Sequence, residues 1–471
     1  MNTPVVDFVR RYAQQRTARM HMPGHKGRGP LGCEELDITE IAGADELYEA
    51  EGIIAQSEAN ATQLFSTART YYSTEGSSQC IRAMLHLALQ MRPAKAGRPV
   101  LLAARNAHKA LLYAAALLDF DIQWLWPAPD AAGALCTCPV EPEALASALD
   151  ELSAEGRTPF GVYLTSPDYL GFVQDVAGLS AVCHAHGLPL LVDNAHGAYL
   201  HFLKEGGRHP IQLGADLCCD SAHKTLPVLT GGAYLHLGTS VQADEGAVRN
   251  ALALFGSTSP SYLILQSLDA ANAVLADGFR EKLDICRWRL GMLCRELDAL
   301  RPGLALPLTG AHREPLKLTL DAAVLGLSGQ QLAQALRERG VECEYADPRY
   351  IVLMPSAESS AAEFACLQTA LHAICGEAPA ADVSVTADDP AAFAALAGAL
   401  EAQPRRFTIR EAVLAPQEMI PAAEAVGRIC AAPAVSCPPA IPIVVSGETV
   451  PPEALPLFAR YGIEKAAVVK E

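Results

Sequence analysis

The sequence predicts an α/β fold with a mostly parallel β-sheet, followed by a smaller α+β unit. Between about residue 70 and residue 240, short continuous apolar runs alternate with helical patterns. Apolar runs of this length between helices are typical of strands that are covered on both faces of a parallel sheet. After about residue 305 the strands and helices no longer alternate in this way. At 471 residues, the chain is long enough for two or three structural units and a large core.

The elements of the alternating region are expected in a regular order. Apolar positions with helical spacing run from Ile81 to Leu89. Strands are expected at residues 99–103, 122–126, 160–165, 188–192, 215–219 and 232–237. Helices are expected at residues 107–118, 141–154 and 179–186.

Three domains are expected along the chain. Residues 1–45 form an N-terminal arm, with a helix at 7–18 and a rigid Gly- and Pro-rich loop at 22–30. Residues 46–305 form the large domain, which ends in a long helical region at 259–300. Residues 306–471 form the C-terminal α+β domain, with a possible linker at 378–389 and two helical patterns after it. Its earlier elements are expected at 316–320 and 350–353 (strands), and at 329–338 and 361–374 (helices).

Composition excludes several classes of protein. The formal net charge of −17 argues against a nucleic-acid partner. No apolar run is long enough for a membrane span, and no secretory signal is visible, so a cytoplasmic protein without a membrane partner is expected. The 14 cysteines do not form a zinc pattern, so no metal site is expected, and Cys218 and Cys219 are expected to be buried free thiols.

Two charged residues follow two of the expected apolar strands. Asp193 ends one apolar run, and Lys224 lies in the turn after another, Ala215–Cys219. Ligands of such sheets bind outside the carboxyl ends of the strands. A lysine there can form a Schiff base with the aldehyde of pyridoxal 5′-phosphate (PLP), and an acid can pair with the pyridine nitrogen. Either residue alone is more often an ordinary loop charge, so the prediction rests on the two together.

Other residues supply what a PLP site requires. Ser77 and Ser78 precede a helix, where hydroxyls and backbone amides can bind a phosphate, although an ordinary helix cap would look the same. His108 follows the next strand, where an imidazole could stack on the ring, although a histidine there is more often a helix-start residue.

The order of these segments resembles the bacterial ornithine/lysine/arginine decarboxylase family. The resemblance is to the shorter form, without an N-terminal wing domain, and it spans nearly the whole chain. It implies the aspartate aminotransferase-like fold (fold type I), with a mostly parallel seven-stranded sheet. The segments that carry it are Met-Pro-Gly-His-Lys-Gly at 22–27, Asp-Ile-Thr-Glu at 37–40, Ser-Ser at 77–78, Asn-Ala-His-Lys at 106–109, Thr-Ser-Pro at 165–167, Asp-Asn-Ala-His-Gly-Ala at 193–198, Ser-Ala-His-Lys-Thr-Leu-Pro at 221–227 and Thr-Ser-Pro-Ser-Tyr at 258–262.

The resemblance implies a role for each matching residue. Lys224 resembles the Schiff-base lysine, Asp193 the pyridinium partner and His108 the ring-stacking histidine. His196 resembles a histidine near the cofactor O3′. Ser77, Ser78, Ser221 and His223 resemble the contacts of the phosphate and those beside the lysine. Thr258 and Ser259 resemble a segment that reaches the neighbouring subunit's cofactor, so a homodimer or higher homo-oligomer is expected.

The chain departs from the family pattern at two places. The family's Tyr-Pro-Pro-Gly-Ile-Pro and Pro-Gly-Glu segments read Cys-Pro-Pro-Ala-Ile-Pro at 437–442 and Ser446-Gly447-Glu448 here. By the second match, Glu448 is a candidate partner for the distal cation of the substrate, or else a solvated loop charge. Glu75 stands where Asn is common, and a carboxylate beside a phosphate is unfavourable, so Glu75 is expected to face solvent or a cation.

The expected activity is decarboxylation of arginine, lysine or ornithine, a small-molecule substrate, to the amine and CO2. Lys224 or His223 would protonate Cα after CO2 leaves. Two alternatives stay open. One is another PLP reaction on this fold, such as that of an aminotransferase or a carbon–sulfur lyase. The other is a cofactor-free regulatory relative, against which Lys224, Asp193 and His108 argue.

Overall fold

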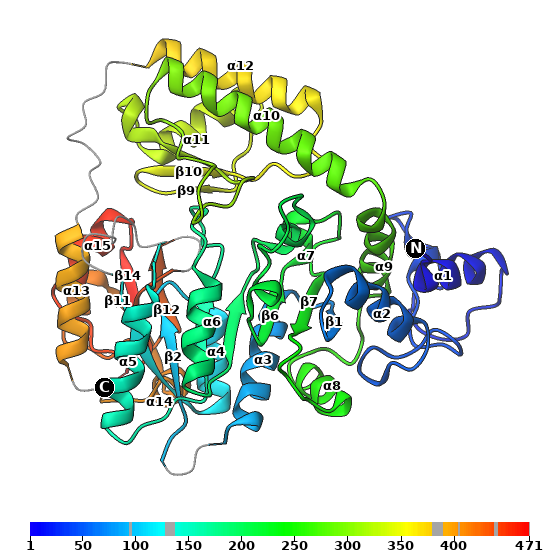
Figure 1. The fold of residues 1–471 in the computed structure, drawn as a ribbon, viewed down its shortest axis with the longest axis horizontal. Helices are drawn as coiled ribbons and strands as arrows, with labels where there is room; N and C mark the ends of the chain where they lie inside the picture. Colours follow the sequence, from blue (N-terminus) through cyan, green and yellow to red (C-terminus); the bar gives the residue numbers. More distant parts are fainter. Residues whose placement is uncertain (94–96, 128–136, 379–389, 404–405, 438–440, 471) are drawn as a thin grey trace. The chain divides into compact units, whose positions relative to one another are not determined.

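The computed structural model describes residues 1–93, 97–127, 137–378, 390–403, 406–437 and 441–470, and it has the predicted α/β architecture (Figure 1). Within that part of the chain, the main sheet has seven strands in the order β1-β7-β6-β5-β4-β2-β3. Strand β5 is parallel to β6, and β2 is parallel to both β3 and β4. Strand β7 runs antiparallel to both of its neighbours, β1 and β6. The mostly parallel seven-stranded sheet is confirmed.

The chain divides into two compact units. The first unit comprises residues 1–93 and 176–284, and the second comprises residues 94–175 and 285–471. The domain boundaries predicted at residues 45 and 305 follow sequence order, whereas each compact unit combines separate segments. Those boundaries stay a prediction.

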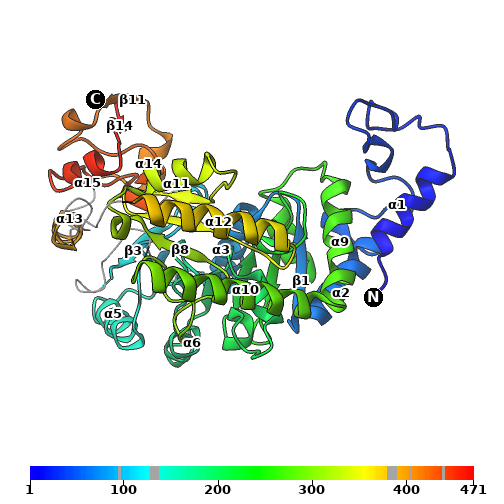
Figure 2. The same ribbon diagram turned by 90° about the horizontal axis from the view of Figure 1, so that it is seen from above.

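The first unit contains the strands that precede Asp193 and Lys224. Its strands are β1 (Arg69–Ser73), β5 (Leu190–Asp193), β6 (Leu217–Asp220) and β7 (Ala233–Leu237). Its helices are α1 (Pro4–Gln14), α2 (Ile53–Phe65), α3 (Ser77–Met91), α6 (Val176–Ala185), α7 (Ala222–Thr225), α8 (Glu245–Ala253) and α9 (Tyr262–Ala276). Helix α1 lies beside α2 and α9 in both views (Figures 1 and 2).

The arm helix is anchored through its N-terminus. The amide groups of Val5 and Val6 each donate to Oδ2 of Asp269 in α9, at 2.9 Å. A carboxylate there satisfies amides that have no partner within the helix and complements the helix dipole. The predicted helix at 7–18 therefore begins earlier, at Pro4, a residue well suited to the first helical position.

Two further differences have local causes. The strand β1 was not predicted, because its apolar run, Tyr71 and Tyr72, is short. The long helical region predicted at 259–300 is two helices, α9 and α10 (Phe279–Leu300). They are separated at Gly278, which has a φ of +78° that a helix interior cannot accommodate.

The second unit combines the remaining strands of the main sheet with an α+β region, as predicted. The main-sheet strands are β2 (Val100–Ala104), β3 (Asp121–Leu125) and β4 (Val162–Thr165), with helices α4 (Lys109–Leu118) and α5 (Pro142–Ala154). The α+β region has the helices α11 (Gly329–Arg337), α12 (Ala361–Glu377), α13 (Pro390–Ala402), α14 (Ile409–Leu414) and α15 (Ala454–Arg460). Its strands are β8 (Leu318–Asp321), β9 (Tyr345–Ala346), β10 (Tyr350–Leu353), β11 (Gln417–Pro421), β12 (Ala434–Cys437), β13 (Ile441–Val445) and β14 (Lys465–Val469).

The α+β region has a core of its own. Leucines of α10, α11 and α12 are buried against the antiparallel sheet β8-β10-β9, and Figure 2 shows α10 and α12 side by side. After residue 390 there are three helices among the described residues, where two were predicted. The predicted linker at 378–389 lies, apart from Ala378, outside the described residues. No helix in the described ranges is both long and apolar enough to cross a membrane.

Candidate active site

Asp193 and Lys224 come from the same edge of the sheet. In the parallel pair β5–β6, Asp193 lies opposite Cys219, so both strands end at one edge. Asp193 is the last residue of β5 and is 3% exposed. Its Oδ1 accepts from the amide of Ala195 at 3.1 Å, which fixes the orientation of the carboxylate. The sheet therefore holds a buried acid at the edge where the predicted lysine follows.

Lys224 lies in the four-residue helix α7, directly after β6. Its Nζ lies 3.1 Å from Nε2 of His196, which is buried in the loop after β5. The helix is fixed at its start, because the amide of His223 donates to the carbonyl of Gly232 at 3.2 Å. The structure thus brings together the predicted lysine and the predicted O3′-side histidine.

A place for an anion lies at the N-terminus of α3. The hydroxyl of Ser221 donates to the hydroxyl of Ser77 at 2.7 Å, which joins the start of α7 to the start of α3. Gly76 caps α3 without a side-chain hydrogen bond, has a φ of +71°, and has open space where a Cβ would stand. The Thr74 hydroxyl is buried and has no hydrogen-bond partner within the described residues. Free helix amides, serine hydroxyls and an orphaned hydroxyl are what a phosphate would satisfy.

The loop that carries these groups is held against β7. The amide of Gly76 donates to the carbonyl of Gly231 at 2.7 Å. Gly231 has a φ of +99°, and a Cβ there would lie 2.9 Å from the carbonyl oxygen of Thr74. The close approach of the two loops therefore requires glycine at this position. Glu75 is exposed, in agreement with the expectation that it faces solvent or a cation.

His223 is oriented by the same loop. Its Nδ1 lies 3.0 Å from the carbonyl oxygen of Gly232, so Nδ1 carries the proton and Nε2 is the basic nitrogen. Burial lowers the pKa of His223, and the charge of Lys224 lowers it further. The imidazole is therefore neutral at neutral pH and able to accept a proton.

The thiols of β6, the strand that leads to Lys224, are unreactive. Cys218 and Cys219 are fully buried in β6, as expected. Burial raises the pKa of both thiols well above the usual value, so both stay protonated.

The remaining predicted cofactor contacts lie in several elements. Ser78 follows Ser77 in the first turn of α3. Thr258 and Ser259 are exposed, just before α9. His108 lies in the second unit, where its Nδ1 accepts from the amide of Ala110 at 3.2 Å and caps α4. The ring-stacking role of His108 and the intersubunit role of Thr258 and Ser259 stay predictions.

Glu448 is buried in the second unit and forms an ion pair. Its two carboxylate oxygens accept from Nη1 and Nη2 of Arg105 at 2.8 and 3.0 Å, and Oε2 also accepts from the amide of Val445 at 2.8 Å. The guanidinium lies over the rings of Trp124 and Trp126, 4.8 and 4.7 Å from their centres. A substrate cation would have to compete with Arg105 for this carboxylate. The predicted substrate role of Glu448 is not tested by this geometry and stays a prediction.

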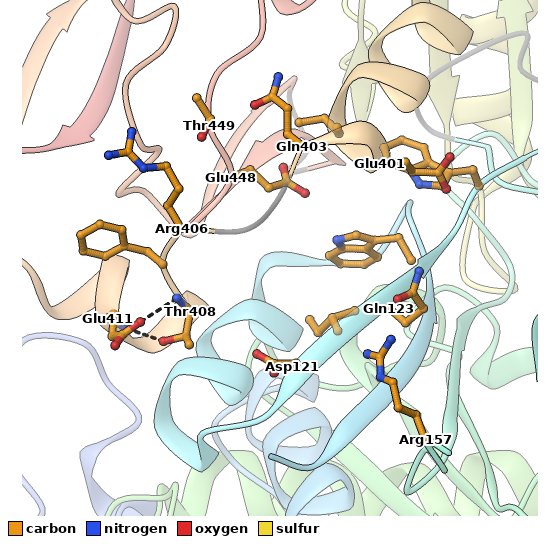
Figure 3. A pocket seen from close by; sticks show the side chains of 15 residues that line it. Asp121, Gln123, Arg157, Glu401, Gln403, Arg406, Thr408, Glu411, Glu448 and Thr449 are labelled. Carbon is orange, nitrogen blue, oxygen red and sulfur yellow. Dashed lines mark hydrogen bonds between the residues drawn. The ribbon is translucent and has the colours of Figure 1, made fainter. Parts of the chain in front are cut away.

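A cavity of about 390 Å³ adjoins this ion pair (Figure 3). Its wall includes Glu448 and the Thr408–Glu411 capping box at the start of α14. Two polar side chains of the lining, Glu401 and Arg406, are exposed to solvent. These groups are paired or solvated, whereas the indole Nε1 of Trp124, which also lines the cavity, is buried and has no hydrogen-bond partner among the described residues. Residues 438–440, which belong to the 437–442 segment that differs from the family pattern, lie outside the described residues.

A group of buried residues that hold the site in place through hydrogen bonds was not predicted from the sequence. Asp220, Asn194, His209 and His236 form one buried hydrogen-bond network next to Asp193 and Ser221. The position of Asp220 directly before Ser221 was the only local signal. The two histidines are brought to it by the fold.

Comparisons with known proteins agree with this geometry. Residues 3–286, more than half of the chain, match the family model described as the Orn/Lys/Arg decarboxylase major domain. An arginine decarboxylase of Halalkalibacterium halodurans is 26% identical over 476 residues, which cover 95% of this chain and 91% of that protein. The protein YaaO of Bacillus subtilis, described as uncharacterised, is 28% identical over 477 residues, with 98% and 94% covered.

Solved structures show the same fold. The constitutive lysine decarboxylase of E. coli superposes with a TM-score of 0.76 at 20% identity, over 99% of this chain and 80% of that one. Its fold is that of the PLP enzymes of fold type I, in agreement with the predicted fold class. On the family match, this chain belongs to the Orn/Lys/Arg decarboxylase family of PLP-dependent enzymes.

Proposed function

We propose that this protein binds PLP at the edge formed by β5 and β6 and decarboxylates a basic amino acid to the amine and CO2. The observation that carries the proposal is the set of groups in one compact unit: Lys224 next to His196, the buried Asp193, and the Ser77–Ser221 pair at the start of α3. Family membership supports the same chemistry.

The described residues fit the cofactor. The amides of the first turn of α3, with Ser77, Ser221 and the orphaned Thr74 hydroxyl, would hold the phosphate. Lys224 Nζ is the amine that would bind the cofactor covalently, and Asp193 is the buried acid for the ring nitrogen. When bound, PLP supplies an electron sink for the pair of electrons left at Cα as CO2 departs.

The chain's own groups then have separate tasks. Asp193, whose Oδ1 accepts from the amide of Ala195, would hold a proton on the ring nitrogen. Lys224 Nζ and the basic Nε2 of His223 are the two candidates for returning a proton to Cα. His196 accepts a hydrogen bond from Lys224 Nζ and so limits the positions of that amine. Fixed charges in a low-dielectric site stabilise charge that develops during the reaction.

Arginine is the first substrate to test. Relatives that align with at least 94% of this chain, from Halalkalibacterium halodurans and several Bacillus species, are named arginine decarboxylases. The relative named a lysine decarboxylase aligns with 56% of the chain. Exposed Thr258 and Ser259 are available to a second copy, which supports a homodimer as part of the proposal.

The test is a substrate panel. PLP-loaded protein is mixed separately with arginine, lysine and ornithine, and CO2 and the organic product are both measured. The proposal expects CO2 and the matching amine from one of the three, and neither from Lys224→Ala. A keto acid in place of CO2 would assign transamination instead.

A further inference from the structure

A second buried carboxylate lies at the edge that carries Asp193 and Lys224. Asp220 ends β6, directly before Ser221, and its side chain is fully buried. Oδ2 lies 3.0 Å from Nε2 of His209 and 3.1 Å from Nε2 of His236, and Oδ1 accepts from Nδ2 of Asn194 at 2.6 Å. A buried carboxylate is costly unless it is hydrogen-bonded, and here both of its oxygens are.

The hydrogen bonds define the state of each group. Nδ1 of His209 accepts from the amide of Ile211 at 3.4 Å, so its proton is on Nε2, facing Asp220. Nδ1 of His236 lies 2.8 Å from the hydroxyl of Thr70, which can donate to it. Both histidines are thus able to donate to Asp220 as neutral rings. Burial opposes the charge on Asp220, but the two histidines outweigh it and hold its pKa well below the usual value.

The network fixes the chain on both sides of the site. Through Asn194, Asp220 holds the residue that follows Asp193, and the amide of Asn194 also donates to the carbonyl of Cys219 at 2.9 Å. Through its own backbone, Asp220 leads into the turn that carries Lys224. The N–H groups of His209 and His236 stabilise the buried charge of Asp220 at this end of β6.

A bound metal would require a different tautomer. Ligand atoms of His209, Cys218 and Asp220 lie within 4.8 Å of one another, which is compatible with a metal ion. A metal on Nε2 of His209 requires the proton on Nδ1, where it would face the amide proton of Ile211. The hydrogen-bonded network satisfies these groups without that conflict.

We infer that Asp220, held by His209 and His236, is a positioning residue that sets the placement of Asp193 relative to the turn bearing Lys224. The inference rests on the proposed function for its consequence, which is tight binding of PLP with its ring nitrogen on Asp193. Asp220 itself acts through Asn194 and the backbone.

The test compares carboxylates at the two ends of β6. Asp220→Asn removes the charge and replaces one acceptor oxygen by an NH2 group, so His209, His236 and Asn194 lose the charged acceptor that they share. Asp216→Asn is the matched control, because Asp216 directly precedes β6, is 5% exposed and bonds to His184 at 2.9 Å and to the amide of Leu190 at 2.8 Å. For each variant, the PLP dissociation constant, the visible band of the lysine-bound cofactor and the unfolding temperature of the apo protein are measured.

Asp220→Asn is expected to weaken PLP binding about tenfold or more and to shift the visible band, as loss of bonds to a charged group implies. Asp216→Asn is expected to leave both unchanged, with a similar loss in unfolding temperature. Equal PLP affinity and equal spectra in the two variants would overturn the inference. A stoichiometric metal that is lost in His209→Gln would also overturn it.

Two further measurements test the inference if Asp220→Asn folds poorly or if the wild-type protein does not bind PLP. His236→Gln keeps a donor near Nε2 and should retain the wild-type spectrum, whereas His236→Ala should shift it. Amide hydrogen exchange in the apo protein should rise at residues 193–197 and 221–226 in Asp220→Asn and not in Asp216→Asn. Unchanged exchange in Asp220→Asn overturns the inference. If the wild type binds no PLP but exchange still rises in Asp220→Asn, only the proposed function is contradicted.

Discussion

Replacing Glu448 by Gln distinguishes a structural role for this residue from a role in substrate binding. Arg105 is 1% exposed and Glu448 is 7% exposed, and two charge-assisted hydrogen bonds join them. The variant leaves the guanidinium buried with a neutral partner. Removing one member of a buried ion pair costs about 3–5 kcal/mol, so the unfolding temperature should fall by roughly 5 °C or more.

The assay combines thermal unfolding with steady-state kinetics. In the double variant Arg105→Met/Glu448→Leu, no buried charge is left unpaired, so it should be more stable than Glu448→Gln. If Glu448 binds the distal cation of the substrate instead, Glu448→Gln should raise KM with little change in kcat and little loss of stability. That second pattern would refute the reasoning from the ion pair.

Three further predictions concern the first unit. Asp193→Asn should fold, but it should lower decarboxylation by orders of magnitude, since the ring nitrogen loses its charged partner; activity within a few-fold of wild type, measured as CO2 release, would contradict this. Gly231→Ala should weaken PLP binding, measured by titration of the visible band, because its Cβ would lie 2.9 Å from the carbonyl oxygen of Thr74, whereas Gly206→Ala, with open space at its Cβ and a similarly positive φ, should not. Burial lowers the pKa of His201 from 6.5 to about 4. The folded state therefore binds this proton only at a lower pH than the unfolded state does. The stability due to the neutral ring is then lost as the pH falls from 6.5 towards 4. His201→Phe should therefore show a smaller loss of unfolding temperature over that pH range, and an equal loss would assign the acid sensitivity to other groups.

The sequence predicted the strands of the sheet because each carries a local pattern. Apolar runs between helices placed β2 to β7 within two residues at either end. The antiparallel strand β1 was not predicted, because its pairing with β7, from Arg69 opposite Leu237 to Ser73 opposite Ala233, defines it rather than a local pattern. The helix α7 also depends on a contact outside its own four residues, between His223 and Gly232.

In the candidate site, too, residues with a local pattern could be predicted and those defined by long-range contacts could not. Asp193 and Lys224 could be predicted, because each follows an apolar strand and parallel strands end at one edge. The partners of Asp220 could not, because His236 reaches it through the β6–β7 register, in which His236 lies opposite Cys218. The contact between Arg105 and Glu448 spans 343 residues and has no local signal.

The most direct test of the account is to locate the cofactor on the chain. Protein loaded with PLP is treated with borohydride, digested, and mapped by mass spectrometry for the pyridoxyl mass. The account predicts one modified lysine, Lys224, and no modification at Lys109 or Lys26. A stable modification on another lysine, or none on Lys224, would contradict the assignment of the β5–β6 edge as the active site.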